Sequence, residues 1–191
     1  AMSLGVTGLL GIAMGSSEAA GYINPAGKMT GWLNELAFAP VDINPEAAAD
    51  EWSGDRGVGA LYFSQQAVNK LLPAADFAVS PELGLPERLK HVQALMAKGS
   101  AAAESIYETI GVYLGHTLPL YAEFYQISHV LVLGRVTTGE GGNIVLRHAK
   151  TVLERDYPDF AGKIELHLPD EKSRRVGQAV AAASLPKIKA S

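Results

Sequence analysis

The sequence predicts an α/β domain built on a mixed β-sheet, and three observations carry that prediction. An apolar hairpin pattern stands near the start of the chain, and strand and helix patterns alternate in its last third. A hairpin pairs its strands antiparallel, whereas strand–helix–strand connections are typical of parallel pairing. The third observation is composition. Of the 191 residues 48% are hydrophobic and 19% are charged, which provides a sizeable core for one domain and excludes a disordered or coiled-coil chain.

The front of the chain predicts the antiparallel part of the sheet. The apolar run 9–14 ends at the turn-like residues 15–17, and a second run covers 19–23. Residues 24–27, Asn-Pro-Ala-Gly, mark the next turn. We therefore expect a hairpin, followed by a third short strand near 28–31.

Residues 32–58 show neither helical nor strand periodicity. Prolines at 40 and 45 and several glycines interrupt this segment. Loops of this length are uncommon in compact domains unless they are functional or form an inserted subdomain. We treat 32–58 as an irregular insertion.

The middle of the chain predicts three helices, over 59–72, 86–98 and 100–124. The third carries a continuous apolar stripe, formed by Ile106, Ile110, Tyr113, Leu114, Leu118, Tyr121 and Phe124. Pro119 should kink this helix, because proline removes a helix hydrogen bond and clashes with the preceding turn.

The last third alternates between strand and helix patterns. A buried-strand run at 130–133 precedes a helical pattern at 144–153, and a second strand pattern covers 164–168. A final helix is expected at 176–183. This order predicts parallel pairing at the back of the sheet.

Charge and residue counts exclude several classes of function. The net charge is −4, so no basic excess indicates direct contact with nucleic acid or a membrane surface. The absence of cysteine excludes disulfides, Cys-ligated zinc and a cysteine nucleophile. No apolar run approaches the ~18 residues of a membrane span, and the N-terminus has no basic leader pattern, so we expect a cytoplasmic protein.

No metal site is expected from the histidines. The chain has five, at positions 91, 116, 129, 148 and 167. None is spaced as H-x-H or H-x-x-x-H, the spacings that bring two imidazoles together within one strand or helix.

Three segments could carry chemistry, and each has an ordinary structural alternative. The small residues Gly15, Ser16 and Ser17 suit a turn whose amides approach phosphate, or simply a tight hairpin. The turn after the strand 130–133 suits a nucleotide, or is an ordinary strand-to-helix loop. Glu35 lies between apolar residues, where its carboxylate could accept a sugar hydroxyl or remain a surface group.

In order and spacing, these segments resemble the C-terminal lobe of a ROK-family protein (repressor, open reading frame, kinase). The stretch 15–22 resembles the family's second phosphate motif, and 35–38 stands where the family has E-x-G-H. Residues 52–67 resemble the family's cysteine motif and the start of the next helix. The stretch 132–136 resembles the adenosine motif, and 177–183 the terminal helix.

The resemblance implies an RNase H-like lobe of the actin, hexokinase and Hsp70 fold, which normally has two such lobes. It implies a sugar site at Asn34 and Glu35. It implies nucleotide contacts from Gly15, Ser16, Ser17, Gly134, Arg135 and Val136. Family members are bacterial sugar kinases and NagC-like transcriptional regulators, so ATP and Mg²⁺ would serve a complete two-lobed parent, and no cofactor is expected for this chain alone.

The departures from the family pattern matter equally. Ser53 and Val58 replace zinc-binding cysteines, and Phe38 replaces the histidine of E-x-G-H. Glu18 brings a negative charge to the phosphate turn, which would repel an anion unless its side chain turns away. The family's first phosphate motif and catalytic Asp are absent from the chain, so we expect no catalytic residue here.

The domain boundaries follow from the resemblance. Residues 1–6 would be a leader or cloning remnant, 7–186 the lobe with its insertion, and 187–191 a tail. A lone lobe would expose an apolar face, so we expect a homo-oligomer and weak sugar binding. Two alternatives stay open, namely a degenerate binding or assembly module of the same fold, and an unrelated α/β domain.

Overall fold

The computed structural model describes residues 5–30 and 34–169. Its strands are β1 (Leu9–Met14), β2 (Glu18–Ile23), β3 (His129–Leu133) and β4 (Glu165–His167). Its longer helices are α1 (Gln65–Leu71), α2 (Leu85–Met96), α3 (Ala101–Ala122) and α4 (Glu140–Asp156). The described residues also contain three short helical turns, namely η1 (Leu36–Phe38), η2 (Gly59–Leu61) and α5 (Pro158–Ala161).

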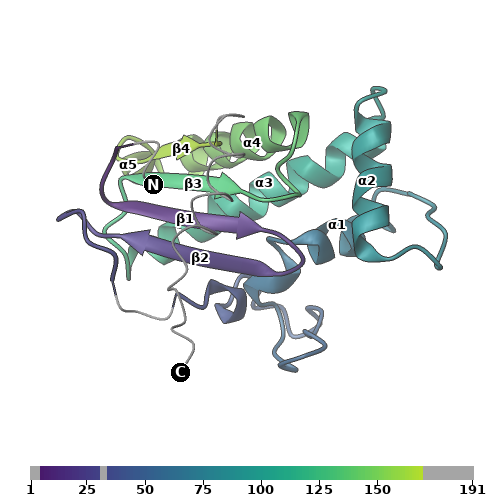
Figure 1. Ribbon diagram of the computed structural model, residues 1–191, viewed down its shortest axis with the longest axis horizontal. Helices are drawn as coiled ribbons and strands as arrows, with labels where there is room; N and C mark the ends of the chain where they lie inside the picture. The colour runs from purple at the N-terminus through teal and green to yellow at the C-terminus, as the bar shows by residue number, and fades with distance from the viewer. Residues whose placement is uncertain (1–4, 31–33, 170–191) are drawn as a thin grey trace, which may run out of the picture.

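The sheet is mixed, as predicted, with the strand order β2-β1-β3-β4 (Figure 1). β1 pairs antiparallel with β2, and parallel with β3, while β3 pairs parallel with β4. Met14 at the end of β1 lies opposite Glu18 in the hairpin, and Ala13 lies opposite Leu133 of β3. The carboxyl ends of β1 and β3 therefore meet at one edge of the sheet.

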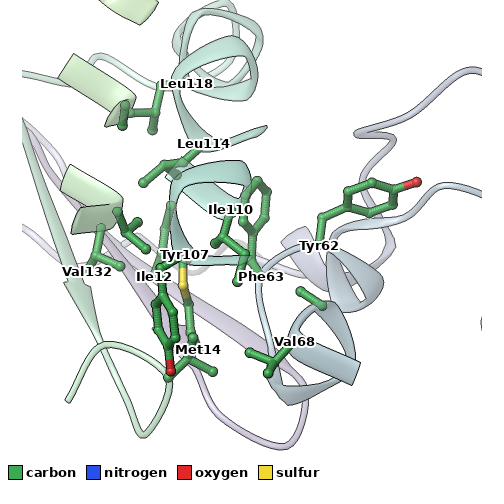
Figure 2. Packing of buried hydrophobic residues seen from close by; sticks show 14 of the residues in the cluster. Ile12, Met14, Tyr62, Phe63, Val68, Tyr107, Ile110, Leu114, Leu118 and Val132 are labelled. Carbon is green, nitrogen blue, oxygen red and sulfur yellow. The ribbon is translucent and has the colours of Figure 1, made fainter. Parts of the chain in front are cut away.

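The core lies between one face of the sheet and the helices. Figure 2 shows strand residues Ile12, Met14 and Val132 together with the α3 residues Tyr107, Ile110, Leu114 and Leu118. All seven of these side chains are fully buried. Phe63 and Val68 extend the same cluster toward α1. Most of the apolar stripe predicted for α3 is thus buried, but Tyr113 is half-buried, and Phe124 lies beyond the helix end at Ala122 and is exposed.

Glycines allow α3 and α4 to pack closely. A Cβ on Gly111 would meet the Val145 carbonyl at 2.6 Å, and one on Gly115 would meet the Val152 Cβ at 2.6 Å. Gly141 in α4 leaves room for the ring of Tyr107. Side chains at these positions would push the two helices apart.

Several element boundaries differ from the sequence-based expectations. The third strand expected near 28–31 is reduced, among the described residues, to the single bridge Ile23↔Met29, because Asn24 and Lys28 close a turn at the sheet edge. α1 begins only after Ser64, whose side chain caps it by accepting from the Gln66 amide. The helix expected at 176–183 lies outside the described residues.

The start of α4 also departs from expectation, whereas α3 continues through Pro119 as expected. α4 begins at Glu140, four residues before the helical pattern at 144–153, and has Gly141 and Gly142 in its first turn. Pro119 lies in the last turn of α3, which continues only to Ala122. A proline so close to the end removes little helix beyond it.

The insertion is an ordered loop held by side chains. The buried Asp50 carboxylate accepts from the backbone amides of Trp52 and Ser53. The Arg56 guanidinium donates to the Ala47 carbonyl at 2.9 Å. These contacts, with the bridges Pro40↔Val58 and Ala49↔Arg56, fix the loop without a helix longer than η1 in its described part.

Candidate functional site

The two predicted nucleotide segments lie side by side at the carboxyl ends of β1 and β3. Gly134 approaches the backbone of Met14 so closely that a Cβ there would clash with it. The Val136 amide also donates to the Met14 carbonyl at 3.2 Å. The turn 15–17, which follows Met14 directly, is thereby joined to the loop that leads into α4 (Figure 1).

The hairpin turn presents small residues to solvent. The Gly15 amide donates to the Ser17 carbonyl at 3.0 Å, and the Gly15 carbonyl accepts from the Gln65 amide at the start of α1. Ser16 and Ser17 are exposed. A ligand can therefore approach this turn without displacing a large side chain.

The second loop contributes backbone more than side chains. Gly134 has a φ of +109° and, like Arg135, is exposed. The Arg135 carbonyl accepts from Gln93 Nε2 at 2.9 Å, which ties the loop to α2. Val136 is fully buried, so its side chain belongs to the core and only its main chain could face a ligand.

Glu18 turns inward at this edge. It is 5% exposed, and neither carboxyl oxygen has a hydrogen-bond partner among the described residues. Burial raises the pKa of Glu18 from 4.5 to about 8, because desolvation penalises the carboxylate. The side chain therefore turns away from the hairpin turn and is mostly protonated at neutral pH. No sequence signal for this burial exists, since Glu18 follows two serines in a turn.

The predicted sugar residues, Asn34 and Glu35, precede a helical turn that lies close to the Glu18 side chain. Gly59 packs against both the Glu18 carboxyl group and the Leu36 carbonyl, with no space for a Cβ. Leu36 begins η1, which Asn34 and Glu35 precede directly. Glu35 is exposed, and its carboxylate makes no hydrogen bond or ion pair with another described residue, whereas Asn34 is half-buried.

An aromatic contact adjoins the positions where the family resemblance implies zinc ligands. The rings of Phe38 and Trp52 lie 5.5 Å apart, centroid to centroid, and both side chains are exposed. Ser53 donates its amide to Asp50, and Val58 is buried. Hydrogen bonds and ring contact thus hold a segment that cysteines and a metal would otherwise hold.

An apolar groove of about 510 Å³ adjoins this region. Its walls are Leu36, Ala39, Pro40, Leu120, Tyr121, Phe124 and Tyr125. Phe124 is 70% exposed and Leu120 is 42% exposed, so the end of α3 leaves large apolar side chains in solvent. Exposed apolar patches of this kind mark contact surfaces.

By sequence, no known family model and no curated protein matches the chain. By structure, it resembles a ROK family transcriptional regulator described as a homologue of the E. coli MLC protein (TM-score 0.64, 18% identity, 84% of this chain and 41% of that one). It also resembles the ROK hexokinase of Thermus thermophilus (TM-score 0.61, 13% identity, 87% and 53%).

A third similar structure is the ROK family glucokinase of Streptomyces griseus in complex with glucose and AMPPNP (TM-score 0.56, 20% identity, 76% and 50%). The chain spans about half the length of these three proteins. The likeness confirms the predicted fold class, a single lobe of the actin/hexokinase-like fold. The resemblance to ROK proteins thus holds at the level of the fold.

No helix in the described part of the chain is long and apolar enough to cross a membrane.

Proposed function

We propose that this chain is the C-terminal lobe of a cytoplasmic ROK-type protein, a sugar kinase or a sugar-responsive regulator. In this proposal it supplies the nucleotide-facing and sugar-facing half of a cleft and does not catalyse phosphoryl transfer alone. The observation that carries the proposal is the junction of the two glycine turns through Met14. Ligands of open α/β sheets bind outside the carboxyl ends of the strands, which is where both turns lie.

The turn residues are compatible with a nucleotide. Gly15, Ser16 and Ser17 leave space for phosphate oxygens, and the exposed Arg135 guanidinium could pair with a phosphate or lie on a base. The inward, protonated Glu18 adds no negative charge to this surface. A bound ATP with Mg²⁺ would supply the phosphoryl group and neutralise its charge.

The sugar contact is assigned to Glu35, with Asn34 beside it. A carboxylate accepts two hydroxyl hydrogen bonds, and the Glu35 carboxylate is exposed and uncommitted among the described residues. Half a cleft leaves water competing for the same groups, so we expect binding by the lone chain to be weak.

Two aspartates of the described residues, Asp42 and Asp50, are unsuited to act as a catalytic base. Asp42 accepts from the Tyr62 hydroxyl at 2.6 Å and from the Asn44 amide, and the Tyr62 bond in particular lowers the pKa of its carboxyl group. A more acidic carboxylate is a poorer base. Asp50 is buried, and its carboxylate accepts from the Trp52 and Ser53 amides, which commits it to holding the loop.

Binding and turnover experiments test the proposal separately. Titration of labelled chain with AMPPNP, followed by NMR, should shift the amides of 15–17 and 134–136, and glucose or an N-acetyl sugar should shift those of 34–36. Glu35→Ala should remove the sugar-induced shifts and leave the nucleotide-induced ones. A coupled ADP-release assay should give no sugar-dependent turnover, and turnover that Glu35→Ala abolishes would contradict the one-lobe proposal.

A second candidate is a degenerate module that keeps the fold for binding or assembly. The contact of Phe38 with Trp52 favours it, because Phe38 stands in place of the family's histidine and packs on a ring beside the sugar segment. If neither nucleotide nor sugar shifts the amide signals of 15–17, 134–136 or 34–36, this candidate is supported over the first.

A further inference from the structure

Three potential metal ligands converge at the edge of the sheet opposite to the glycine turns. His129 begins β3, and Glu165 and His167 lie on the neighbouring edge strand β4. The parallel register sets His129 opposite Glu165, and His167 is two residues further along the same strand. Since alternate strand residues share a face, the three side chains lie on one face of the sheet.

The donor atoms are close to one another. His129 Nδ1 lies 3.0 Å from His167 Nε2, and the Glu165 Oε2 atom lies 3.7 Å from each of these nitrogens. A tetrahedral zinc ion with bonds of 2.0–2.1 Å holds its ligand atoms about 3.3 Å apart. Shifts of a few tenths of an ångström would therefore bring all three atoms into a zinc coordination shell.

We propose that His129, Glu165 and His167 form a binding site for a first-row divalent metal ion, with Zn²⁺ as the best fit. Two imidazoles and one carboxylate are a ligand set that zinc accepts, and the fourth position would hold water or an outside ligand. The site is distinct from the segment around Phe38, Ser53 and Val58, and the proposal does not depend on the proposed function.

The surroundings suit a partly pre-formed site. The histidine side chains are about one-fifth exposed, which limits their rotation, whereas the Glu165 side chain is 71% exposed and can adjust its position. Two cationic side chains of α4 line the same hollow as Glu165 and His167, and both already have partners, since Lys150 lies 3.6 Å from Glu154 and Arg147 lies 3.6 Å from Glu104. Their repulsion of a bound cation is correspondingly reduced.

Other described histidines lack such a set. His148 approaches one carboxylate, that of Glu108, at 3.5 Å, and His116 approaches that of Asp156 at 3.8 Å. Within 5–30 and 34–169, the only group of three suitable ligands is the one at His129. His148 therefore provides a matched control, a half-buried histidine beside a single carboxylate.

Sequence spacing conceals this site. His129 and His167 are 38 residues apart, and only the parallel pairing of β3 with β4 brings them together. The competing explanation is a hydrogen bond between two neutral imidazoles, for which Glu165 would not be needed. The variants below distinguish the two.

The experiment uses the full 191-residue chain without an affinity tag, freed of metal with a chelator. Calorimetric titration with ZnCl₂ should give one ion per chain, and Co²⁺ should give the intense visible bands of a tetrahedral site. His167→Gln should weaken Zn²⁺ binding at least about 100-fold, because even partners outside the coordination shell are worth 10–100-fold. Glu165→Gln should weaken it by a smaller factor, and His148→Gln should leave it unchanged.

Thermal unfolding supplies a second readout. Zn²⁺ should raise the Tm of the native chain and of His148→Gln but not that of His167→Gln. If His167→Gln does not fold, His129→Gln and the Co²⁺ spectrum of the native chain decide. The proposal would be overturned by no saturable Zn²⁺ binding, by an octahedral Co²⁺ spectrum, by equal losses in His148→Gln and His167→Gln, or by unchanged affinity in Glu165→Gln.

Discussion

The two ends of the central strands expose different chemical groups. At the carboxyl ends of β1 and β3, small residues bring main chain against main chain, as Gly134 does with Met14. At the amino end of β3 and along the short strand β4, side chains with nitrogen and oxygen donors gather on one face, as those of His129 and His167 do. Main-chain amides suit anions, whereas imidazole and carboxylate suit cations. One sheet thus presents two edges with opposite ligand preferences.

The largest expected effect concerns the buried acid at the carboxyl end. The folded chain holds the Glu18 proton more tightly than the unfolded chain, with a pKa of about 8 against 4.5. The free energy of unfolding should therefore fall as the pH rises from 4.5 to 8, by up to roughly 5 kcal/mol.

Comparison with Glu18→Gln isolates this contribution. The variant should gain stability relative to the native chain as the pH rises from 4.5 to 8, and the difference should level off above 8. Urea unfolding at several pH values measures it. A difference that does not change with pH would mean that Glu18 is ionised when folded.

The next effect tests whether the carboxyl end depends on close main-chain contact. Gly134→Ala should destabilise the chain by about 3 kcal/mol, because the new Cβ meets the Met14 backbone and the φ of +109° strains any side chain. Gly139→Ala is the matched control. Gly139 has a φ of +65° and a ψ of −144°, a backbone conformation largely confined to glycine, but nothing lies within 4 Å of its Cβ position, so Gly139→Ala should lose about 2 kcal/mol from backbone strain alone.

Chemical denaturation of both variants gives the two values. If the two variants lose equal stability, backbone strain alone explains the loss in Gly134→Ala, and the contact of the new Cβ with Met14 contributes little.

The smallest effect concerns the apolar groove beside the end of α3. Phe124 is 70% exposed there, and we expect a second copy of the chain to cover it. Phe124→Ser should weaken self-association about tenfold or more and leave the stability of the fold within about 0.5 kcal/mol.

Sedimentation equilibrium across concentrations measures the association. Ile43→Ser is the control, since Ile43 is 94% exposed but does not line the groove. A native chain that sediments as a monomer throughout would refute the expectation.

The sequence predicted the fold where a single periodicity dominates. Continuous apolar runs located β1 and β3, alternating residues located β4, and the stripe on α3 located the helix that covers the sheet. Turn residues after β1 and β3 also indicated the candidate nucleotide edge, because turns at the ends of parallel strands share one edge.

Features that depend on tertiary contacts could not be predicted in this way. The helical pattern starts only at 144, but α4 begins at Glu140 and includes Gly141 and Gly142, because Gly141 accommodates the ring of Tyr107. The burial of Glu18 depends on Gly59, more than 40 positions away in the sequence. The approach of His129 to His167 depends on strand pairing that no local pattern encodes.

The position of β1 in the sheet has a consequence for how the chain folds. α3, β3 and α4 are consecutive in sequence, and the glycines of α3 already fit them together, so this segment can form through contacts of short range. The β1–β2 hairpin must then dock with β1 against β3, which closes a loop of more than 100 residues. Because closing long loops is slow, we infer that the helical segment forms the folding nucleus and that the hairpin docks last. The edge that carries the glycine turns would then be the last part of the sheet to take shape.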